Sequence, residues 1–364
     1  MKNSLKIGIG IWLLIAIIAI PFPFAIFPKF SYTHSDRLLL YQVVGALLPI
    51  GWLLGLLSLR IKNKQRFILD FLYVSLSFIL AFYLLKYGFD KVFKNQFYFP
   101  EPNTLHTPLG QLSKDILFWS SMGSSYWYNI FMGLIEVIPA LFLLHRRTRM
   151  FGALISFGVL LNVWAINIGF DISVKVLSTL LVLIALYILS FSWRKVLAFA
   201  TNKKMGSVEK RTSLLAEKPV LKRLLKGSII GLFCIEIFLP FLRLGEFNRD
   251  NSIITAPHGS YAVIDAPAGA KVNSKIIRIH FHSKGWMILE DDQQTFEDYR
   301  MTYSTLRKSV SLVNEKITFS LKEKDKITLM SWTENGEEFT CELEKIDLDK
   351  LPLAKDEITL FVER

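Results

Sequence analysis

The sequence predicts a membrane all-α bundle of seven transmembrane helices, followed by a C-terminal antiparallel all-β domain that is a barrel or a sandwich. Apolar runs, each near the roughly 20 residues that a helix needs to cross the hydrocarbon core, recur as far as residue 244. From about residue 251 they give way to period-two alternation, which is typical of half-buried strands. The composition, 52% hydrophobic with a mean hydropathy of +0.36, is too apolar for a soluble chain of this length.

Seven apolar runs are long enough to be membrane spans. The first could be read as a signal peptide, but its apolar core is long and no small-residue cleavage site follows Pro21 and Pro23, so we expect an uncleaved span. The seven runs are 6–27, 38–59, 67–87, 126–144, 151–170, 174–192 and 227–244.

The distribution of basic residues predicts the orientation of these spans. Lys and Arg are dense in the connections 60–66, 145–149 and 194–226, and sparse or mixed with acidic residues in the alternate connections. The positive-inside bias then predicts a cytoplasmic N-terminus and an extracytoplasmic C-terminal domain, with the spans in the inner (cytoplasmic) membrane. Because these loops account for the net charge of +12, we expect the lipid bilayer as a partner and no nucleic acid.

The C-terminal domain, residues 251–364, is predicted to hold eight or nine strands. Alternation is clearest at 277–282 and 318–321, and the turn signals include Ser283-Lys284-Gly285 and Asn335-Gly336. A domain of about 110 residues can bury a core of its own. The two cysteines lie in different environments, Cys234 in an apolar run and Cys341 in this domain, so no disulfide is expected.

Polar residues inside the apolar runs indicate a candidate site. A carboxylate in a membrane helix is costly, so Glu136 should face protein rather than lipid. Helical spacing puts small or polar residues on one face of each of four runs, and we expect these faces to point inward and form a pocket that opens outward beneath residues 88–125. The faces are Tyr83, Tyr87, Asp90, Lys91; Ser125, Asn129, Gly133, Glu136; Gly158, Asn162, Ala165, Gly169; and Lys175, Ser178, Thr179.

Two interpretations of this pocket stay open. In the first, it binds a small molecule or a quinone head group, Glu136 relays a proton as the catalytic residue, and the other residues line the pocket. In the second, Glu136 bonds Asn162 and a lysine in a structural network that fixes helix register. The expected lining residues are Tyr87, Lys91, Gln96, Asn129, Asn162, Asn167, Asp171 and Lys175.

Other chemistry has weaker support in the sequence. His280 and His282 have a spacing that two metal ligands could use, but no third ligand is near, so we expect a solvated strand face and no metal. The glycines Gly8 and Gly10 are attributed to helix packing, because no strand precedes them. No catalytic motif is present, so the sequence leaves open whether the protein is an enzyme.

The central part of the chain resembles the DoxX-like family of bacterial integral membrane proteins. The resemblance covers a four-helix unit at about 67–202, leaving 1–66 as two N-terminal spans and 203–250 as a basic cytoplasmic linker with the seventh span. In the C-terminal part, Gly285-Trp286 and Asp298-Tyr299-Arg300 are similar to the extracytoplasmic domain of some relatives. The four-helix resemblance is carried by Tyr87-Gly88, Lys91, Phe93, Gln96-Phe97, Gly133-Leu134-Ile135-Glu136, Arg146-Arg147-Thr148, Gly152-Ala153-Leu154, Asn162, Asn167, Phe170-Asp171 and Val174-Lys175.

The chain departs from the family pattern after the glutamate, where Ile138-Pro139 replaces residues that are often small. The resemblance implies a redox-associated membrane module, for which we expect a quinone or another small molecule to bind in the outward-opening polar pocket. An alternative is a non-catalytic anchor whose domain 251–364 binds an extracytoplasmic protein partner. A transporter is a further alternative, although the sequence lacks the inverted repeats expected of one.

Overall fold

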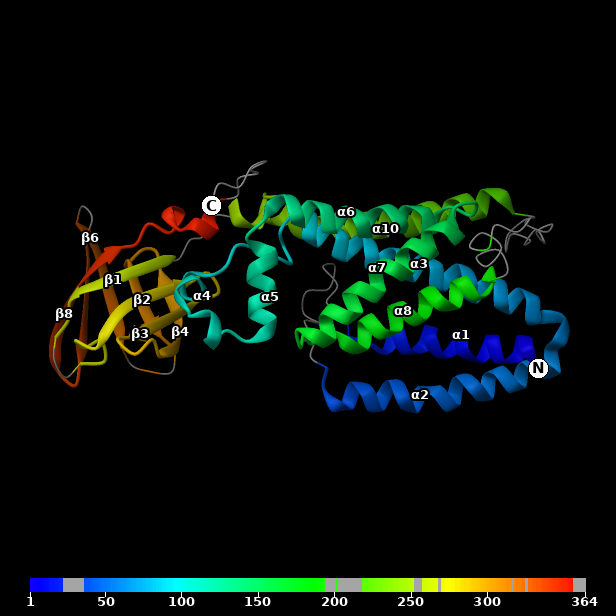
Figure 1. Ribbon diagram of the computed structural model, residues 1–364, viewed down its shortest axis with the longest axis horizontal. Helices are drawn as coiled ribbons and strands as arrows, with labels where there is room; N and C mark the ends of the chain where they lie inside the picture. Colours follow the sequence, from blue (N-terminus) through cyan, green and yellow to red (C-terminus); the bar gives the residue numbers. More distant parts are fainter. Residues whose placement is uncertain are drawn as a thin grey trace. The chain divides into compact units, whose positions relative to one another are not determined.

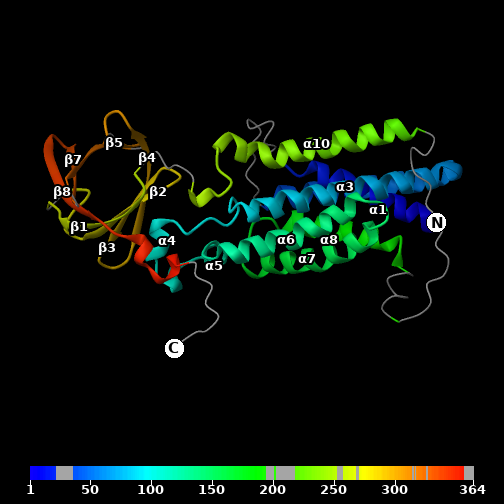
Figure 2. The same ribbon diagram turned by 90° about the horizontal axis from the view of Figure 1, so that it is seen from above.

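The computed structural model describes residues 1–21, 36–193, 201, 218–251, 257–267, 270–313, 315, 317–324 and 327–355. The chain forms two compact units. One is helical and contains Met1–Gln96 and Trp127–Phe247, and the other contains Phe97–Tyr126 and Asn248–Arg364. Figures 1 and 2 show the long helices of the first unit running alongside one another, and the strands of the second wrapping around a common axis.

Five helical stretches of the described residues are long and apolar enough to cross a membrane, which agrees with a multi-pass membrane protein. One of the five, Leu38–Val92, is divided by the short helix η2 (Ser58–Lys64), in which Ile61 leaves helical geometry. The helix α8 is apolar but shorter, with 16 residues. The long helices are α1 (Lys2–Ala19), α2 (Leu38–Leu57), α3 (Gln65–Val92), α6 (Tyr126–Leu144), α7 (Arg149–Gly169), α8 (Lys175–Ser190) and α10 (Pro219–Leu244).

The bounds of three helices differ from the predicted runs by four residues or more. α3 ends at Val92, five residues after the predicted end. α10 begins at Pro219, eight residues before the predicted start, so part of the expected basic linker is helical. A proline at the first position of a helix costs no hydrogen bond, which makes Pro219 a favourable start. α1 ends at Ala19, and the rest of the first predicted run from residue 22 lies outside the described residues.

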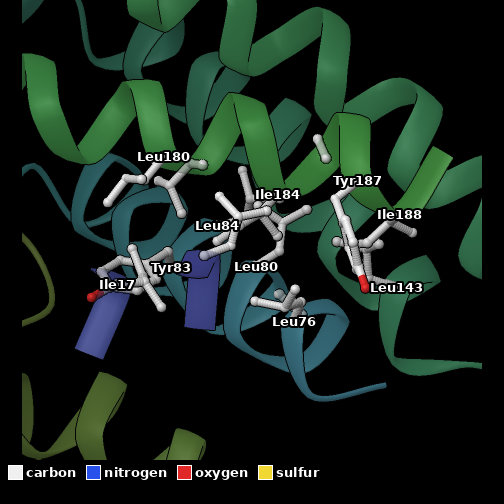
Figure 3. Close-up of a cluster of buried hydrophobic side chains, with 14 of the residues drawn as sticks. Ile17, Leu76, Leu80, Tyr83, Leu84, Leu143, Leu180, Ile184, Tyr187 and Ile188 are labelled. Carbon is white, nitrogen blue, oxygen red and sulfur yellow. The ribbon is translucent and has the colours of Figure 1, made fainter. Parts of the chain in front are cut away.

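The core of the helical unit lies between α3 and α8. Figure 3 shows Leu76, Leu80 and Leu84 of α3 facing Leu180 and Ile184 of α8. All of these side chains are almost completely buried. In lipid such contacts stabilise the bundle mainly through close packing, since the surrounding tails are as apolar as leucine.

Glycines let α2 pack closely on α1. A Cβ atom added at Gly55 would lie 2.8 Å from the Cα atom of Gly8, and the hydroxyl of Ser4 donates a hydrogen bond to the carbonyl of Gly55. A side chain at either glycine would push the helices apart. The attribution of Gly8 to helix packing is therefore confirmed.

α7 approaches α6 closely despite Pro139. A Cβ atom at Gly152 would lie 2.8 Å from the carbonyl oxygen of Pro139. Next to it, the buried side chain of Arg149 donates a hydrogen bond of 2.9 Å to the carbonyl of Leu143, at the end of α6. A helix end leaves carbonyls without partners, and Arg149 satisfies one of them. The residue therefore stabilises the turn between α6 and α7.

The second unit contains a closed antiparallel barrel of eight strands, so the open choice between barrel and sandwich is settled. Each strand pairs with the next, and β1 pairs with β8. Gly285, Asn335 and Gly336 have positive φ in two of the connecting turns, as their turn signals predict. The strands are β1 (Gly259–Asp265), β2 (Ile276–His282), β3 (Trp286–Asp291), β4 (Phe296–Ser304), β5 (Ser309–Leu312), β6 (Thr318–Lys324), β7 (Ile327–Glu334) and β8 (Glu337–Lys345).

The barrel encloses its own apolar core. Ile279 and Phe281 of β2 are buried with Phe319, Met330 and other inward residues. This inward face follows from the alternation, which places every second residue of a strand on the same side.

Residues 97–126 belong to the same unit as the barrel, which the sequence did not predict. They form three short helices, α4 (Pro102–His106), η3 (Leu109–Gln111) and α5 (Lys114–Gly123). The stretch 109–119 is divided between η3 and α5, with a break at Leu112 and Ser113.

Candidate functional site

The centre of the candidate site is an ion pair between α3 and α6. The Nζ atom of Lys91 lies 2.9 Å from Oε2 of Glu136, and the two side chains are only 6% and 3% exposed. Glu136 therefore faces protein, and a lysine balances its charge within the helical unit. The network interpretation expected Glu136 to bond Asn162 and a lysine. The structure shows the lysine, which is Lys91, whereas Asn162 is exposed.

A pair of glycines brings these two side chains together. A Cβ atom at Gly88 would lie 2.9 Å from the carbonyl oxygen of Gly133, so the backbones of α3 and α6 touch at this point. Lys91 and Glu136 each lie three residues beyond one of these glycines. α3 and α6 run in opposite directions (Figures 1 and 2), so the two charged residues lie on either side of the glycine contact. A Cβ atom at Gly88 would lie 3.3 Å from the Cβ atom of Glu136, and the long side chain of Lys91 reaches the Glu136 carboxylate from the next turn of α3.

Three further predicted residues lie around the ion pair. The carbonyl of Tyr87 accepts a weak hydrogen bond of 3.5 Å from the Nζ atom of Lys91. The same Nζ atom lies 5.8 Å from the centre of the Tyr87 ring. Asn129 is fully buried on α6, four residues before Gly133. Gln96 follows the end of α3, and its Oε1 atom is buried with no hydrogen-bond partner among the described residues.

A second buried pair adjoins the first. Lys86 donates to both carboxylate oxygens of Asp90 at 2.9 Å, within α3. Asn95 also donates to Asp90, at 3.1 Å. Asp90 immediately precedes Lys91, so the end of α3 carries two neutralised ion pairs. Buried charges are tolerated when they are paired and hydrogen-bonded in this way.

Asn162 does not join the site, so the predicted inward face of α7 is wrong. Gly158, Asn162, Ala165 and Gly169 are all exposed. The buried face of α7 is instead formed by Gly152, Ala153, Ser156, Leu160 and Asn167. Small residues occur on both faces of this helix, so their pattern alone does not identify the inner one.

The predicted residues at the ends of α7 and α8 have local roles. Lys175 and Asp171 form an ion pair of 2.6 Å, and the Asp171 side chain is 82% exposed. The buried Asn167 accepts a hydrogen bond of 2.9 Å from the amide of Ile172 through its own carbonyl, and so helps end α7. None of the described contacts joins these residues to Glu136.

Asp36 is a functional side chain that sequence reasoning missed. Its carboxylate accepts hydrogen bonds from the backbone amides of Lys175 and Val176, at 2.7 and 3.2 Å. A carboxylate at a helix N-terminus satisfies free amides and opposes the positive end of the helix dipole. Its distance in sequence from α8 concealed this role, and no local signal could have found it.

His280 is not solvated, in contrast to the expectation. It lies on the outer face of β2 but is fully buried, because the ring of His106 covers it at 5.2 Å between ring centroids. Its two ring nitrogens are hydrogen-bonded to Ser260 at 2.8 Å and to Glu290 at 2.9 Å. Among the residues that the structure describes, no group of three potential ligands is placed to hold a metal ion.

The fold and the site together define a multi-pass membrane protein with a separate β-barrel domain and a buried ion pair between two of its apolar helices. It is 33% identical over 137 residues to the uncharacterised protein YwoB of Bacillus subtilis (strain 168), in a match that spans 35% of this chain and 81% of that protein. The chain belongs to the same family as YwoB, whose name assigns no function. No family model matches the chain. No solved structure matches it either.

Proposed function

We propose that this protein is a non-catalytic membrane anchor that displays its β-barrel to a protein partner outside the cytoplasmic membrane. The anchor consists of seven spans, α1, α2, α3, α6, α7, α8 and α10, with the N-terminus in the cytoplasm. An odd number of crossings puts the barrel on the opposite side, so the short helix α8 must cross as well. The positive-inside bias of the loops supports this orientation.

The observation that carries this proposal is the closed pairing of Glu136 with Lys91. A proton relay needs a group that can reach a substrate or a chain of proton carriers. Here both charged groups are almost completely buried, and each neutralises the other at 2.9 Å. This geometry favours a clamp between α3 and α6, and it leaves the barrel as the part of the chain that meets partners.

Reporter fusions test the orientation. Alkaline phosphatase is active only outside the cytoplasm, so a fusion after Arg364 should be active and a fusion after Arg147 should be inactive. Activity of the Arg147 fusion would contradict the proposed orientation, and so would an inactive but stably produced fusion at Arg364.

Photo-crosslinking in intact cells tests the display of the barrel. Leu306 is 98% exposed in the turn between β4 and β5, whereas Trp127 on α6 is 56% exposed on an apolar helix. A photoreactive residue at Leu306 should give one discrete protein adduct, and the same probe at Trp127 should give mainly lipid adducts. The absence of any protein adduct at Leu306 and at other exposed barrel positions would refute the adaptor role.

A DoxX-like, redox-associated module that binds quinone is the second candidate. The buried Oε1 atom of Gln96 supports it, because an acceptor without a partner could be satisfied by a ligand donor such as a quinol hydroxyl. The backbone amide of Gln96 donates to the carbonyl of Asp90, so this residue lies close to the ion pairs of α3. In this candidate Glu136 relays a proton to the bound group.

Mass spectrometry of lipids extracted from the purified protein tests this second candidate. Quinone should copurify with the native chain and be lost in Gln96→Leu. The control is Asn162→Leu, which changes an exposed amide on α7 and should retain the quinone. Equal quinone content in all three proteins would exclude specific binding at Gln96.

A further inference from the structure

The segment 97–106 is attached to the barrel through Glu101. This carboxylate is 8% exposed and accepts hydrogen bonds from the backbone amide of Ser283, at 3.1 Å, and from the Ser283 hydroxyl. Nε2 of His258 lies 3.4 Å from the same group. Nδ1 of His282 lies 3.5 Å from the Glu101 carboxylate. This nitrogen already accepts a hydrogen bond from the amide of Lys284, so in the neutral ring it cannot donate one to Glu101.

A second contact lies at the other end of α4. The ring of His106 packs on the ring of His280, and the hydroxyl of Ser260 lies 3.4 Å from the carbonyl of Pro102. His280 is in turn bonded to Glu290, whose other oxygen accepts from Arg278 at 2.6 Å. The short helix α4 therefore covers a polar network on the outer face of β1, β2 and β3.

These two contacts gather four of the six histidines in the chain, His106, His258, His280 and His282. Histidine is the side chain whose ordinary pKa lies nearest neutrality, so its charge changes under mildly acidic conditions. A histidine that a docked segment keeps buried and neutral couples the docking to the uptake of protons.

We propose that residues 97–106 form an acid-releasable latch on the barrel, closed at neutral pH and opened when the histidines beneath and within it take up protons. The closed state holds the connection between α3 and α6 against the outer face of the barrel through Glu101 and His106. In the open state the barrel stays folded, because its own core does not include the segment.

The direction of the pH effect follows from the histidines. Burial lowers the pKa of His280 to about 3, with the positive charges of His106 and Arg278 adding to the shift. Burial likewise lowers the pKa of His106 and of His282. A group whose pKa is lower in the closed state binds more protons in the open state, so the latch keeps its full stability above about pH 6.5 and loses it as the pH falls below that value.

Protonation of Glu101 also weakens the closed latch, but at lower pH than protonation of the histidines. Although burial opposes the shift, hydrogen bonds from His258 and Ser283 lower the pKa of Glu101 to about 2. The contribution of Glu101 is therefore complete above its ordinary value of 4.5 and declines as the pH falls toward 2. The histidines would open the latch first, and protonation of Glu101 would complete the release.

The other charged groups around the latch do not reverse this sign. Arg278 lowers the pKa of both His106 and His280, and Lys284 lowers that of His282. Glu290 opposes the shift at His106, and Glu101 itself and Asp298 oppose it at His282, but burial is the largest cause at each of the three histidines and the net shift stays downward.

Hydrogen exchange of the full-length protein in detergent micelles tests the latch. The probes are the amide of Ser283, which donates to Glu101, and the amide of Leu105, which donates to the Glu101 carbonyl within α4. After correction for intrinsic exchange, protection of both amides should fall at least about tenfold between pH 7.5 and 4.5, since one pKa unit of difference between the two states corresponds to a factor of ten. Amides shared by β7 and β8 should keep their protection.

Two variants identify the groups responsible. Glu101→Gln should lower the protection of the Ser283 amide already at pH 7.5. The double variant His106→Phe with His282→Asn should keep the segment closed to lower pH, because neither replacement can be protonated and the carboxamide introduced by His282→Asn can still accept from the amide of Lys284. The control His145→Asn, in the exposed turn before α7, should follow the native pH profile.

Three results would overturn the latch. The first is equal protection of the segment at both pH values, and the second is an unchanged pH profile in the double variant. The third is simultaneous loss of protection in β7 and β8, which would indicate acid unfolding of the whole barrel.

Discussion

Lys91 on α3 and Glu136 on α6 are joined by a 2.9 Å ion pair that spans the contact between Gly88 and Gly133. The glycines bring the backbones together, and the charged groups then meet in the space that the close approach creates. Packing and electrostatics thus depend on each other at this point of the bundle.

Removing either charge alone should destabilise the helical unit. Lys91→Met leaves the Glu136 carboxylate buried without a counter-charge, a change that costs about 3–5 kcal/mol for a buried pair. The double variant Lys91→Met with Glu136→Gln should recover most of this loss. Unfolding in mixed micelles, followed by circular dichroism, measures both effects. Equal stability of the single and double variants would show that the two residues do not act as a pair.

A side chain at the glycine contact should also loosen the ion pair. A Cβ atom at Gly133 would lie 2.5 Å from the carbonyl oxygen of Gly88, so Gly133→Ala forces α3 and α6 apart and should cost about 1–3 kcal/mol. Gly158→Ala on α7 is the matched control, because a Cβ atom there meets nothing within 4 Å. The control should be neutral or stabilising in the same unfolding measurement, whereas equal losses in both variants would argue against a specific contact.

Loss of the Asp36 cap should weaken the start of α8. Asp36→Ala frees two amides at the helix N-terminus and should cost about 0.5–2 kcal/mol, the usual range for an N-terminal cap. Asp171→Ala removes only an exposed ion pair and should cost at most about 1 kcal/mol. Exchange rates of the Lys175 and Val176 amides report the difference directly. Unchanged exchange rates in Asp36→Ala would mean that water replaces the carboxylate and that the cap does not stabilise the start of α8.

Cys341 should resist thiol reagents while the barrel is folded. It is 1% exposed, and burial, aided by the charges of Asp265 and Glu342, raises its pKa to about 12. Very little reactive thiolate is then present at pH 8. A maleimide applied to Cys234→Ser should label Cys341 only after denaturant unfolds the barrel. Rapid labelling without denaturant would contradict the buried position in the core of the barrel.

Much of the β-domain could be predicted from the sequence because its signals are local. Alternation identified strands near β2 and β6, and Asn335 with Gly336 marked a turn that needs positive φ. The outer position of His280 also follows from the alternation, since Ile279 and Phe281 face the core. Its burial could not be predicted, because α4 covers it from a part of the chain more than 150 residues away.

The candidate site was predictable only in part, because contacts between distant parts of the chain decide which residues are buried. Glu136 and Asn129 were expected to face inward, and both are buried. Asn162 was also expected there, but the inner face of α7 is decided by which side packs against α8 and, at Gly152, against α6. Gly88 and Gly133 mark the faces at which α3 and α6 meet, and they are the signal in the sequence that could have identified these two helices as neighbours.

The hydrogen bonds between β1 and β8 limit how anything can recognise the barrel. Many domains capture peptides by letting them extend an open sheet through main-chain hydrogen bonds. A continuous ring of strands offers no free strand backbone for that purpose. A molecule that binds the wall of this barrel must therefore read its outward side chains and turns, so its specificity is open to change by surface substitutions that leave the strands intact.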